Sequence, residues 1–177
     1  RQPRLPEPGE TMFGSSFTTV PGGKGLNQAI ASARVGGDVA FLGAVGDDAF
    51  GRELRATLDA AGADTAGLAV VPSPTGTAHI AVLDDGENSI VVVPDANGIE
   101  LPLDESQRAA IRAARYLVVQ LERPLPLIAE AVAFARANGV TTVVTPAPAR
   151  QLPAGFLENV DVLVPNAGEA RALAEVD

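Results

Sequence analysis

The sequence has 177 residues, of which 46% are hydrophobic and 20% are charged, values typical of an ordinary globular domain. Its net charge of −9 argues against binding of nucleic acid or an anionic membrane through a basic face. The absence of cysteine and the single histidine, His79, exclude thiolate zinc sites and histidine-rich metal sites, so a bound metal should be a hard ion with oxygen ligands. No apolar run approaches the ~18 residues of a membrane span and no basic leader opens the chain, which predicts a cytoplasmic protein.

The first half of the chain predicts alternating strands and helices. Side chains over 12–20 alternate with a period of two, as in a strand, whereas Ala29, Ile30 and Ala33 recur at helical spacing until Gly36 ends the helix. The elements expected next are a strand over 39–45, a helix that begins at 47–48 and closes at 62, and strands over 68–71, 75–83 and 89–93. The last two strands are joined by a turn over 84–88, which predicts an antiparallel hairpin.

The second half predicts further strands without alternation, each separated by a helix. The expected elements are a helix over 104–114 capped by Asp104, a strand over 116–121, a helix over 124–138, strands over 140–145 and 161–164, and a helix over 167–176. Such a pattern indicates a parallel sheet covered on both faces. We therefore expect one α/β domain over 1–177, with an open, Rossmann-like, mostly parallel sheet and helices on both faces. A small antiparallel β insertion should be built from about 12–20 and 75–93.

Ligands of open parallel sheets bind beyond the carboxyl ends of the strands, where loops and helix N-termini meet. Gly22, Gly23, Lys24 and Gly25 open a helix that also carries Asn27, so free amides, a lysine and a side-chain amide can face one ligand. The segment is not a Walker phosphate loop, because the glycine spacing differs and Gly25 follows the lysine. Taken alone, it is equally well a glycine turn before a helix.

Three other groups follow predicted strands or begin helices. Glu122, taken alone, is a solvated carboxylate at a strand end that can pair with Arg123, and the functional alternative is an acceptor for two hydroxyls of a polyol. Asn166 and Glu169 are favoured as a helix N-cap with its capping-box glutamate, and the alternative is an oxygen-donor pair that positions hydrated magnesium near phosphates. The aspartates at 47–48 are most simply a helix start, and His79 is most simply a packed or surface histidine.

Taken in chain order, these segments resemble the ribokinase branch of the ribokinase-like (PfkB) carbohydrate kinase family along nearly the whole chain. The matching motifs lie at 8–11, 22–34, 43–51, 75–78, 86–90, 120–122, 146–150 and 165–169. One such motif is weak, but motifs in the family's order along the chain are a strong signal. The resemblance implies an ATP-dependent sugar kinase that transfers the γ-phosphoryl group to the 5-hydroxyl of ribose.

The resemblance also implies roles for individual residues and for the insertion. The implied site residues are Gly22, Gly23, Lys24, Gly25, Asn27 and Glu122 for the sugar, Asn166 for the nucleotide, and Glu169 for Mg²⁺ through water. The implied cofactors are ATP, Mg²⁺ and a monovalent cation (K⁺). The antiparallel insertion would be a lid over the sugar, and the lids of two subunits would pair in a homodimer, which would also cover their strand edges.

Departures from the family pattern leave alternatives open. The family's first strand, with its sugar-binding aspartate, would precede Arg1, and its Gly-Ala-Gly-Asp segment with the catalytic base would follow Asp177. We therefore expect the sugar side of a kinase and no activity from these residues alone. Thr145, where asparagine is usual, and 94–98, where Gly-Ala-Asn is usual, leave the exact sugar open. The alternatives are a sister kinase for a nucleoside or ketose and a non-catalytic sugar-binding or dimerising fragment.

Overall fold

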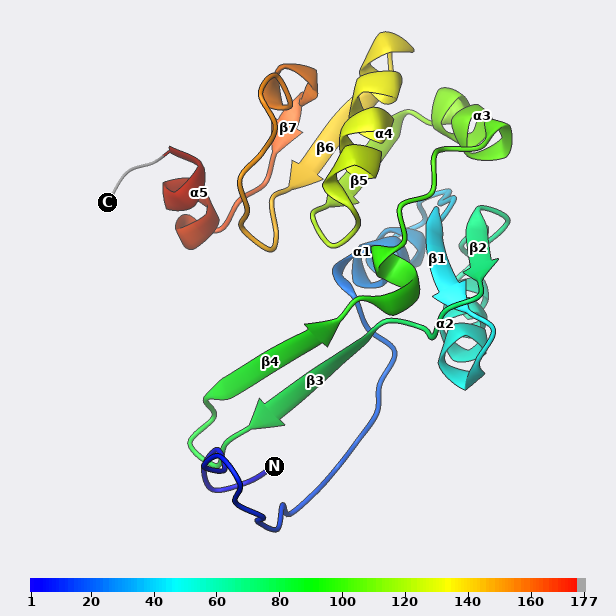
Figure 1. Cartoon of the computed structure of the whole chain (residues 1–177). Coiled ribbons are helices and arrows are strands. Elements are labelled where there is room, and N and C mark those ends of the chain that lie inside the picture. The colour runs from blue at the N-terminus through cyan, green and yellow to red at the C-terminus, as the bar shows by residue number, and fades with distance from the viewer. Residues whose placement is uncertain (175–177) are drawn as a thin grey trace.

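The computed structural model describes residues 1–174, shown in Figure 1. Its elements in chain order are α1 (Lys24–Arg34), β1 (Gly43–Gly46), α2 (Ala49–Ala60), β2 (Leu68–Val71), β3 (Thr77–Val82), β4 (Asn88–Val93), η1 (Asp95–Gly98), α3 (Glu105–Ala113), β5 (Tyr116–Gln120), α4 (Leu125–Ala137), β6 (Thr141–Thr145), η2 (Leu157–Asn159), β7 (Val162–Leu163) and α5 (Ala167–Ala174). The expected mixed α/β fold with parallel strands and a small antiparallel hairpin is confirmed. The predicted continuation of the last helix beyond Ala174 lies outside the described residues. None of the helices in this range has both the length and the apolar character needed to cross a membrane.

The helix boundaries follow the capping signals of the sequence. Asp48 caps α2 by accepting a hydrogen bond from the amide of Gly51 at 2.8 Å. Asp104 caps α3 in a reciprocal capping box with Gln107, as expected for the first turn of a helix. Gly139, with a φ of 73°, follows the end of α4 in the left-handed conformation that glycine adopts without strain. Helix starts and stops were thus predictable from single residues.

The strands form three separate sheets rather than one. β1 and β2 are parallel, β5, β6 and β7 are parallel in that order, and β3 pairs with β4 in an antiparallel hairpin. The expected single open sheet is therefore divided. Its continuity is lost because, within residues 1–174, no strand bonds to the second edge of β1 or of β5. Helix α1 contacts both α2 and β5 and so spans the two parallel sheets.

The β1–β2 sheet lies between two layers, as the packing of adjacent residues of β1 shows. Val45 packs with Leu58 of α2, whereas Ala44 packs with Ala96 of η1. Because successive strand residues point to opposite faces, α2 and η1 cover opposite faces of the β1–β2 sheet. η1, which directly follows the hairpin, therefore packs on the β1–β2 sheet.

The β5–β6 sheet has its own core with α4, which holds Leu121, Ile128, Val132, Val144 and Phe156.

The predicted strand over 12–20 is wrong. Within residues 1–174 this segment has no strand partner, and its Phe13 and Phe17 are 97% and 90% exposed. Its main chain instead turns back on the N-terminus, where the amide of Ser15 donates to the carbonyl of Arg1 at 2.8 Å. Alternation alone does not make a strand, because the backbone groups need a neighbouring edge and the apolar side chains need a surface to cover. The antiparallel insertion consists of β3 and β4.

The β3–β4 hairpin extends away from the rest of the fold (Figure 1). Its register places Ile80 opposite Ile90 and Ala78 opposite Val92, so these side chains share one face. Ile80, Ile90 and Val92 are 56%, 55% and 64% exposed. A two-stranded hairpin with an exposed apolar face has little stability of its own. Its position therefore depends on the segments that join it to the main domain, which we call its first root (74–76, before β3) and its second root (94–96, after β4).

Candidate functional site

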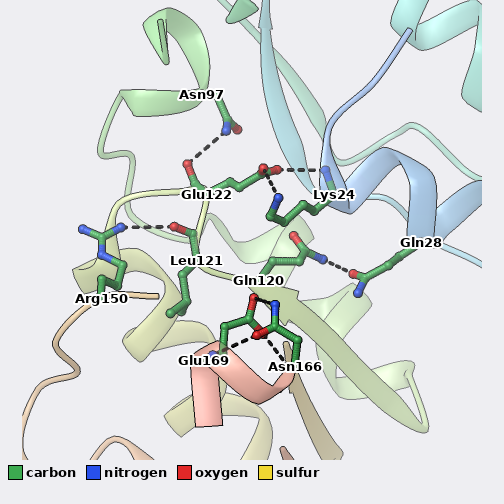
Figure 2. Close-up of polar contacts among 9 residues, drawn as sticks. All are labelled: Lys24, Gln28, Asn97, Gln120, Leu121, Glu122, Arg150, Asn166 and Glu169. Atoms are coloured by element: carbon green, nitrogen blue, oxygen red, sulfur yellow. Dashed lines mark hydrogen bonds and ion pairs between the residues drawn. The ribbon is translucent and has the colours of Figure 1, made fainter. Parts of the chain in front are cut away.

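Lys24 and Glu122 meet at the carboxyl end of β5 (Figure 2). The backbone amide of Lys24 donates to Oε2 of Glu122 at 2.9 Å, and the Lys24 ammonium lies 3.4 Å from Oε1. The two residues are 98 positions apart in the sequence. Lys24 begins α1 and Glu122 follows β5, so the contact joins a helix N-terminus to a strand end, where ligands of parallel sheets bind. Both side chains remain partly exposed, at 43% and 29%, and are accessible to a ligand.

Glycine is required on the α1 side of this contact. Gly23 is the N-cap of α1 with a φ of 107° and ψ of 142°, a conformation that is essentially restricted to glycine. A Cβ at Gly23 would lie 4.0 Å from Oε2 of Glu122, and a Cβ at Gly25 would lie 3.2 Å from Oε1 of Gln120. The glycine turn therefore lets the chain enter the helix close to the end of β5. Gly22, which is exposed, precedes this turn.

Asn27, a predicted sugar residue, is not joined to this contact by the structure. It is exposed on α1 and borders a surface hollow with Pro21 and Ile30. Within residues 1–174 its side chain makes no hydrogen bond, and none connects it to Lys24 or Glu122. Its role in the sugar site stays a prediction.

A chain of side-chain hydrogen bonds lies next to the Lys24–Glu122 contact (Figure 2). Gln120 donates to the side-chain oxygen of Gln28, and Gln28 donates to the hydroxyl of Thr145 at 3.1 Å. These bonds connect the first turns of α1 to the ends of β5 and β6. Sequence analysis missed Gln28, although its position one helical turn after Lys24 places both on one face. Thr145, a departure from the family pattern, is thus joined through Gln28 to Gln120 at the end of β5.

The backbone that carries Glu122 is held by two residues that sequence analysis did not select. Asn97 donates from Nδ2 to the Glu122 carbonyl at 3.1 Å, and Arg150 donates to the Leu121 carbonyl at 3.1 Å (Figure 2). Both lie in segments noted in the sequence, 94–98 and 146–150, but main-chain acceptors leave no pattern that would identify them. The position of Glu122 therefore depends on segments that follow β4 and β6.

Asn166 and Glu169 form a reciprocal capping box at the start of α5. Glu169 N donates to Oδ1 of Asn166 at 2.8 Å, while Asn166 donates from its backbone amide at 2.9 Å and from Nδ2 at 2.8 Å to the two carboxylate oxygens. The favoured interpretation as a helix cap is confirmed. Among the described residues, no group of three or more metal-ligating side chains is close enough together to hold a metal ion. Water-mediated magnesium binding by Glu169 stays a prediction.

Asp48 does more than begin α2. Besides the Gly51 amide, its carboxylate accepts hydrogen bonds from the amide and hydroxyl of Thr75, each at 2.7 Å. The bond from the Thr75 amide is the largest cause that lowers the Asp48 pKa below its ordinary value, followed by the bond from Gly51. Because Thr75 precedes β3, Asp48 fixes the first root of the hairpin. His79 lies exposed on β3 with Nε2 3.2 Å from the Thr77 hydroxyl, which confirms the surface interpretation.

Comparison with known proteins identifies the family. Residues 1–177 match the pfkB family carbohydrate kinase domain. The chain belongs to the pfkB family of carbohydrate kinases. The ribokinase of Haemophilus influenzae is 38% identical over 178 residues, an alignment that covers 99% of this chain and 58% of that protein. The deoxyribokinase of Salmonella typhi is 34% identical over 173 residues and is covered to 56%, against 96% of this chain.

A solved structure shows that this pfkB-family chain also shares the family fold. The structure of Arabidopsis thaliana ribokinase complexed with ribose and ATP superposes with a TM-score of 0.90 at 29% identity. The superposition covers 98% of this chain and 58% of that one. The chain thus spans well under two thirds of the length of the relatives it matches. The resemblance stated from the motifs and the expected fold class are both confirmed.

Proposed function

We propose that the protein is an ATP-dependent sugar kinase that phosphorylates the 5-hydroxyl of ribose, and that this chain carries its sugar-binding half. The observation that carries the proposal is the contact between Lys24 and Glu122. It brings the glycine-lysine turn and the strand-end glutamate, two motifs of the family, to one partly exposed point. Family membership supports the phosphoryl-transfer chemistry, and the ribokinase relatives support ribose as the acceptor.

The donor and acceptor inventory suits a polyol. An ionised carboxylate has about four lone-pair positions, so Glu122 can accept from two sugar hydroxyls while it keeps the Lys24 amide. The Lys24 ammonium would donate to a third sugar oxygen, and Asn27 would complete the set. The turn at Gly22, Gly23 and Gly25 would let the sugar approach the backbone. Fixed donors and acceptors of this kind orient the reacting hydroxyl, which is a large part of phosphoryl-transfer catalysis.

The phosphate side of the proposal rests on Asn166 and Glu169. ATP supplies the γ-phosphoryl group, and Mg²⁺ neutralises the charge of the phosphates. A carboxylate and an amide oxygen are ligands that Mg²⁺ prefers, and lone pairs remain on both groups beside the capping bonds. We propose that these two side chains contact hydrated magnesium and nucleotide through water. Activation by K⁺ and a cytoplasmic location stay predictions.

The β3–β4 hairpin is proposed as the lid over the sugar and as the contact between two subunits. Its exposed face of Ile80, Ile90 and Val92 supports this role, because pairing with a second hairpin would remove the apolar side chains from water. The partners we propose for the protein are therefore a sugar, ATP and a second copy of itself.

Calorimetric titration of the 177-residue chain with ribose and 2-deoxyribose, beside an ATP-coupled assay with both sugars, a ketose and a nucleoside, tests the proposal. We expect ribose to bind, and we expect no turnover from these 177 residues alone, because they do not contain the Gly-Ala-Gly-Asp segment that carries the family's catalytic base. A preference for 2-deoxyribose would favour the activity named for the Salmonella relative. A preference for the ketose or the nucleoside would indicate a sister kinase. No binding to any of them would overturn the proposed sugar site.

A further inference from the structure

The short segment that carries Glu122 is bonded to the fold at consecutive residues. The amide of Leu121 donates to the carbonyl of Ala147 at 2.9 Å, and the carbonyls of Leu121 and Glu122 accept from Arg150 and Asn97. β5 has already ended at Gln120, so no strand pairing holds this segment. Its geometry therefore depends on one main-chain bond to Ala147 and on the side chains of Arg150 and Asn97.

Asn97 donates to the Glu122 carbonyl, and Arg123, the next residue, donates back to the segment that carries Asn97. Its Nη1 donates to the carbonyl of Ala96 at 3.1 Å and to that of Asn97 at 2.9 Å. Burial lowers the Arg123 pKa, and within the described part of the chain no carboxylate pairs with the guanidinium. A half-buried charge without a counterion is costly unless its donors find acceptors, and here two main-chain carbonyls of η1 accept from Nη1. We call these contacts of Arg123 and Asn97, which link 96–97 to 122–123, the Arg123 clamp.

The other end of the clamp is the second root of the β3–β4 hairpin. β4 ends at Val93, and the chain enters η1 through Asp95, which has a φ of 41°. Ala96 has no exposed surface and packs on β1–β2, and its amide donates to the carbonyl of Pro74 at 2.9 Å. Pro74 lies at the first root, so this bond joins the two roots of the hairpin. A left-handed residue followed by a fully buried one leaves this turn little freedom.

We propose that Arg123 is a positioning residue that holds the root of the β3–β4 hairpin and the Glu122 segment in one fixed relation. It does not contact the sugar. The effect of Arg123 on sugar binding rests on the proposed function, whereas the link between the hairpin root and the Glu122 segment does not. The arrangement makes Glu122 and the hairpin one unit, so that a change in the hairpin is transmitted to the carboxylate.

Arg123→Gln tests the link, with Arg55→Gln as a matched control. Arg55 is also half-buried and holds main chain through its guanidinium, with bonds to Thr65 O at 3.0 Å and Leu68 O at 2.7 Å, but away from Glu122. Hydrogen exchange of the unliganded chain should show the amides of Ala96 and Leu121 exchanging about tenfold faster in Arg123→Gln. Arg55→Gln should leave them unchanged and accelerate the region of Leu68 instead.

Ribose titration of the same variants tests the positioning role. The dissociation constant should rise about tenfold in Arg123→Gln, partly recover in Arg123→Lys, and stay within about twofold of the wild type in Arg55→Gln. If Arg123→Gln does not fold, Arg123→Lys and Asn97→Ala carry the same comparison, since each weakens one side of the clamp. Unchanged exchange would overturn the link, and faster exchange with unchanged affinity would overturn the positioning role. A wild type that binds no ribose would contradict the proposed function alone, because the exchange comparison still decides the link.

Discussion

The Lys24 ammonium lies 3.4 Å from Oε1 of Glu122, and the Lys24 amide holds the other carboxylate oxygen. One residue therefore contacts the glutamate through its backbone and its side chain together. The backbone bond persists whatever the side chain does, because it depends on the direction of α1. The ammonium, which is partly exposed, can move to a ligand without releasing the helix from β5.

Lys24 should be protected by ribose against an amine-reactive ester. It is the only lysine among the 177 residues, so its modification is read directly by peptide mass spectrometry. At ribose tenfold above the dissociation constant, acylation should slow about tenfold, because only the free form reacts. The α-amine of Arg1, which bonds to the Ser16 carbonyl at 2.9 Å, is an internal control and should react at the same rate with and without sugar. Equal rates at Lys24 would place the sugar elsewhere.

Gly23→Ala should impair sugar binding beyond its cost in stability. A side chain in the Gly23 backbone conformation costs about 1–3 kcal/mol, and relief of that strain would turn the entry of α1 away from Glu122. Gly139→Ala is the matched control, because Gly139 also has a positive φ but a Cβ there would meet open space. Both variants should unfold at lower urea concentration, and only Gly23→Ala should lose ribose affinity in calorimetry. Equal affinity in the two variants would show that the turn is structural alone.

The extent to which the sequence predicts this structure differs between local and distant contacts. The cap at Asp104 and the stop at Gly139 were predictable because both act within one helical turn. The prediction of a strand over 12–20 was wrong because the alternation of side chains does not show whether a neighbouring strand edge is present. Glu122 was recognised through the family motif. The pairing of Arg123 with Glu122 was wrong, because Arg123 bonds instead to main-chain carbonyls 26 and 27 residues away, which every residue type presents. Contacts to main chain across the fold leave no sequence pattern.

Asp48 should make part of the stability dependent on pH in acid. Its hydrogen bonds from Thr75 and Gly51 lower its folded-state pKa, so its contribution is present above the unfolded value of about 4 and is lost as the pH falls through the folded value. Urea unfolding from pH 7 to pH 2.5 should show Asp48→Asn less stable than the wild type at neutral pH. The difference should shrink below about pH 4. Asp47→Asn is the control, because the Asp47 side chain is 86% exposed and pairs with the exposed Arg52, so its removal should cost little stability at neutral pH.

Val92→Glu should dissociate the proposed dimer. Val92 shares the apolar face of the hairpin with Ile80 and Ile90, and a carboxylate at its position would be buried unpaired in the contact between two hairpins. Analytical ultracentrifugation should show a dimer for the wild type and a monomer for the variant. Val35→Glu changes a valine that is 86% exposed after α1 and should leave the dimer intact. A monomeric wild type at every concentration would refute pairing through the hairpin.

The most direct test of the sugar site is calorimetric titration of Glu122→Gln with ribose. The substitution keeps the shape of the side chain but replaces the carboxylate, whose oxygens accept from Lys24 and, in our proposal, from the sugar. The affinity for ribose should therefore fall about 10- to 100-fold. Glu130→Gln is the control, because Glu130 also pairs with a basic residue, Arg108, at a similar exposure of 35%. The ribose affinity of Glu130→Gln should equal that of the wild type. Ribose binding by Glu122→Gln at wild-type affinity would contradict the central claim that Lys24 and Glu122 form the sugar site.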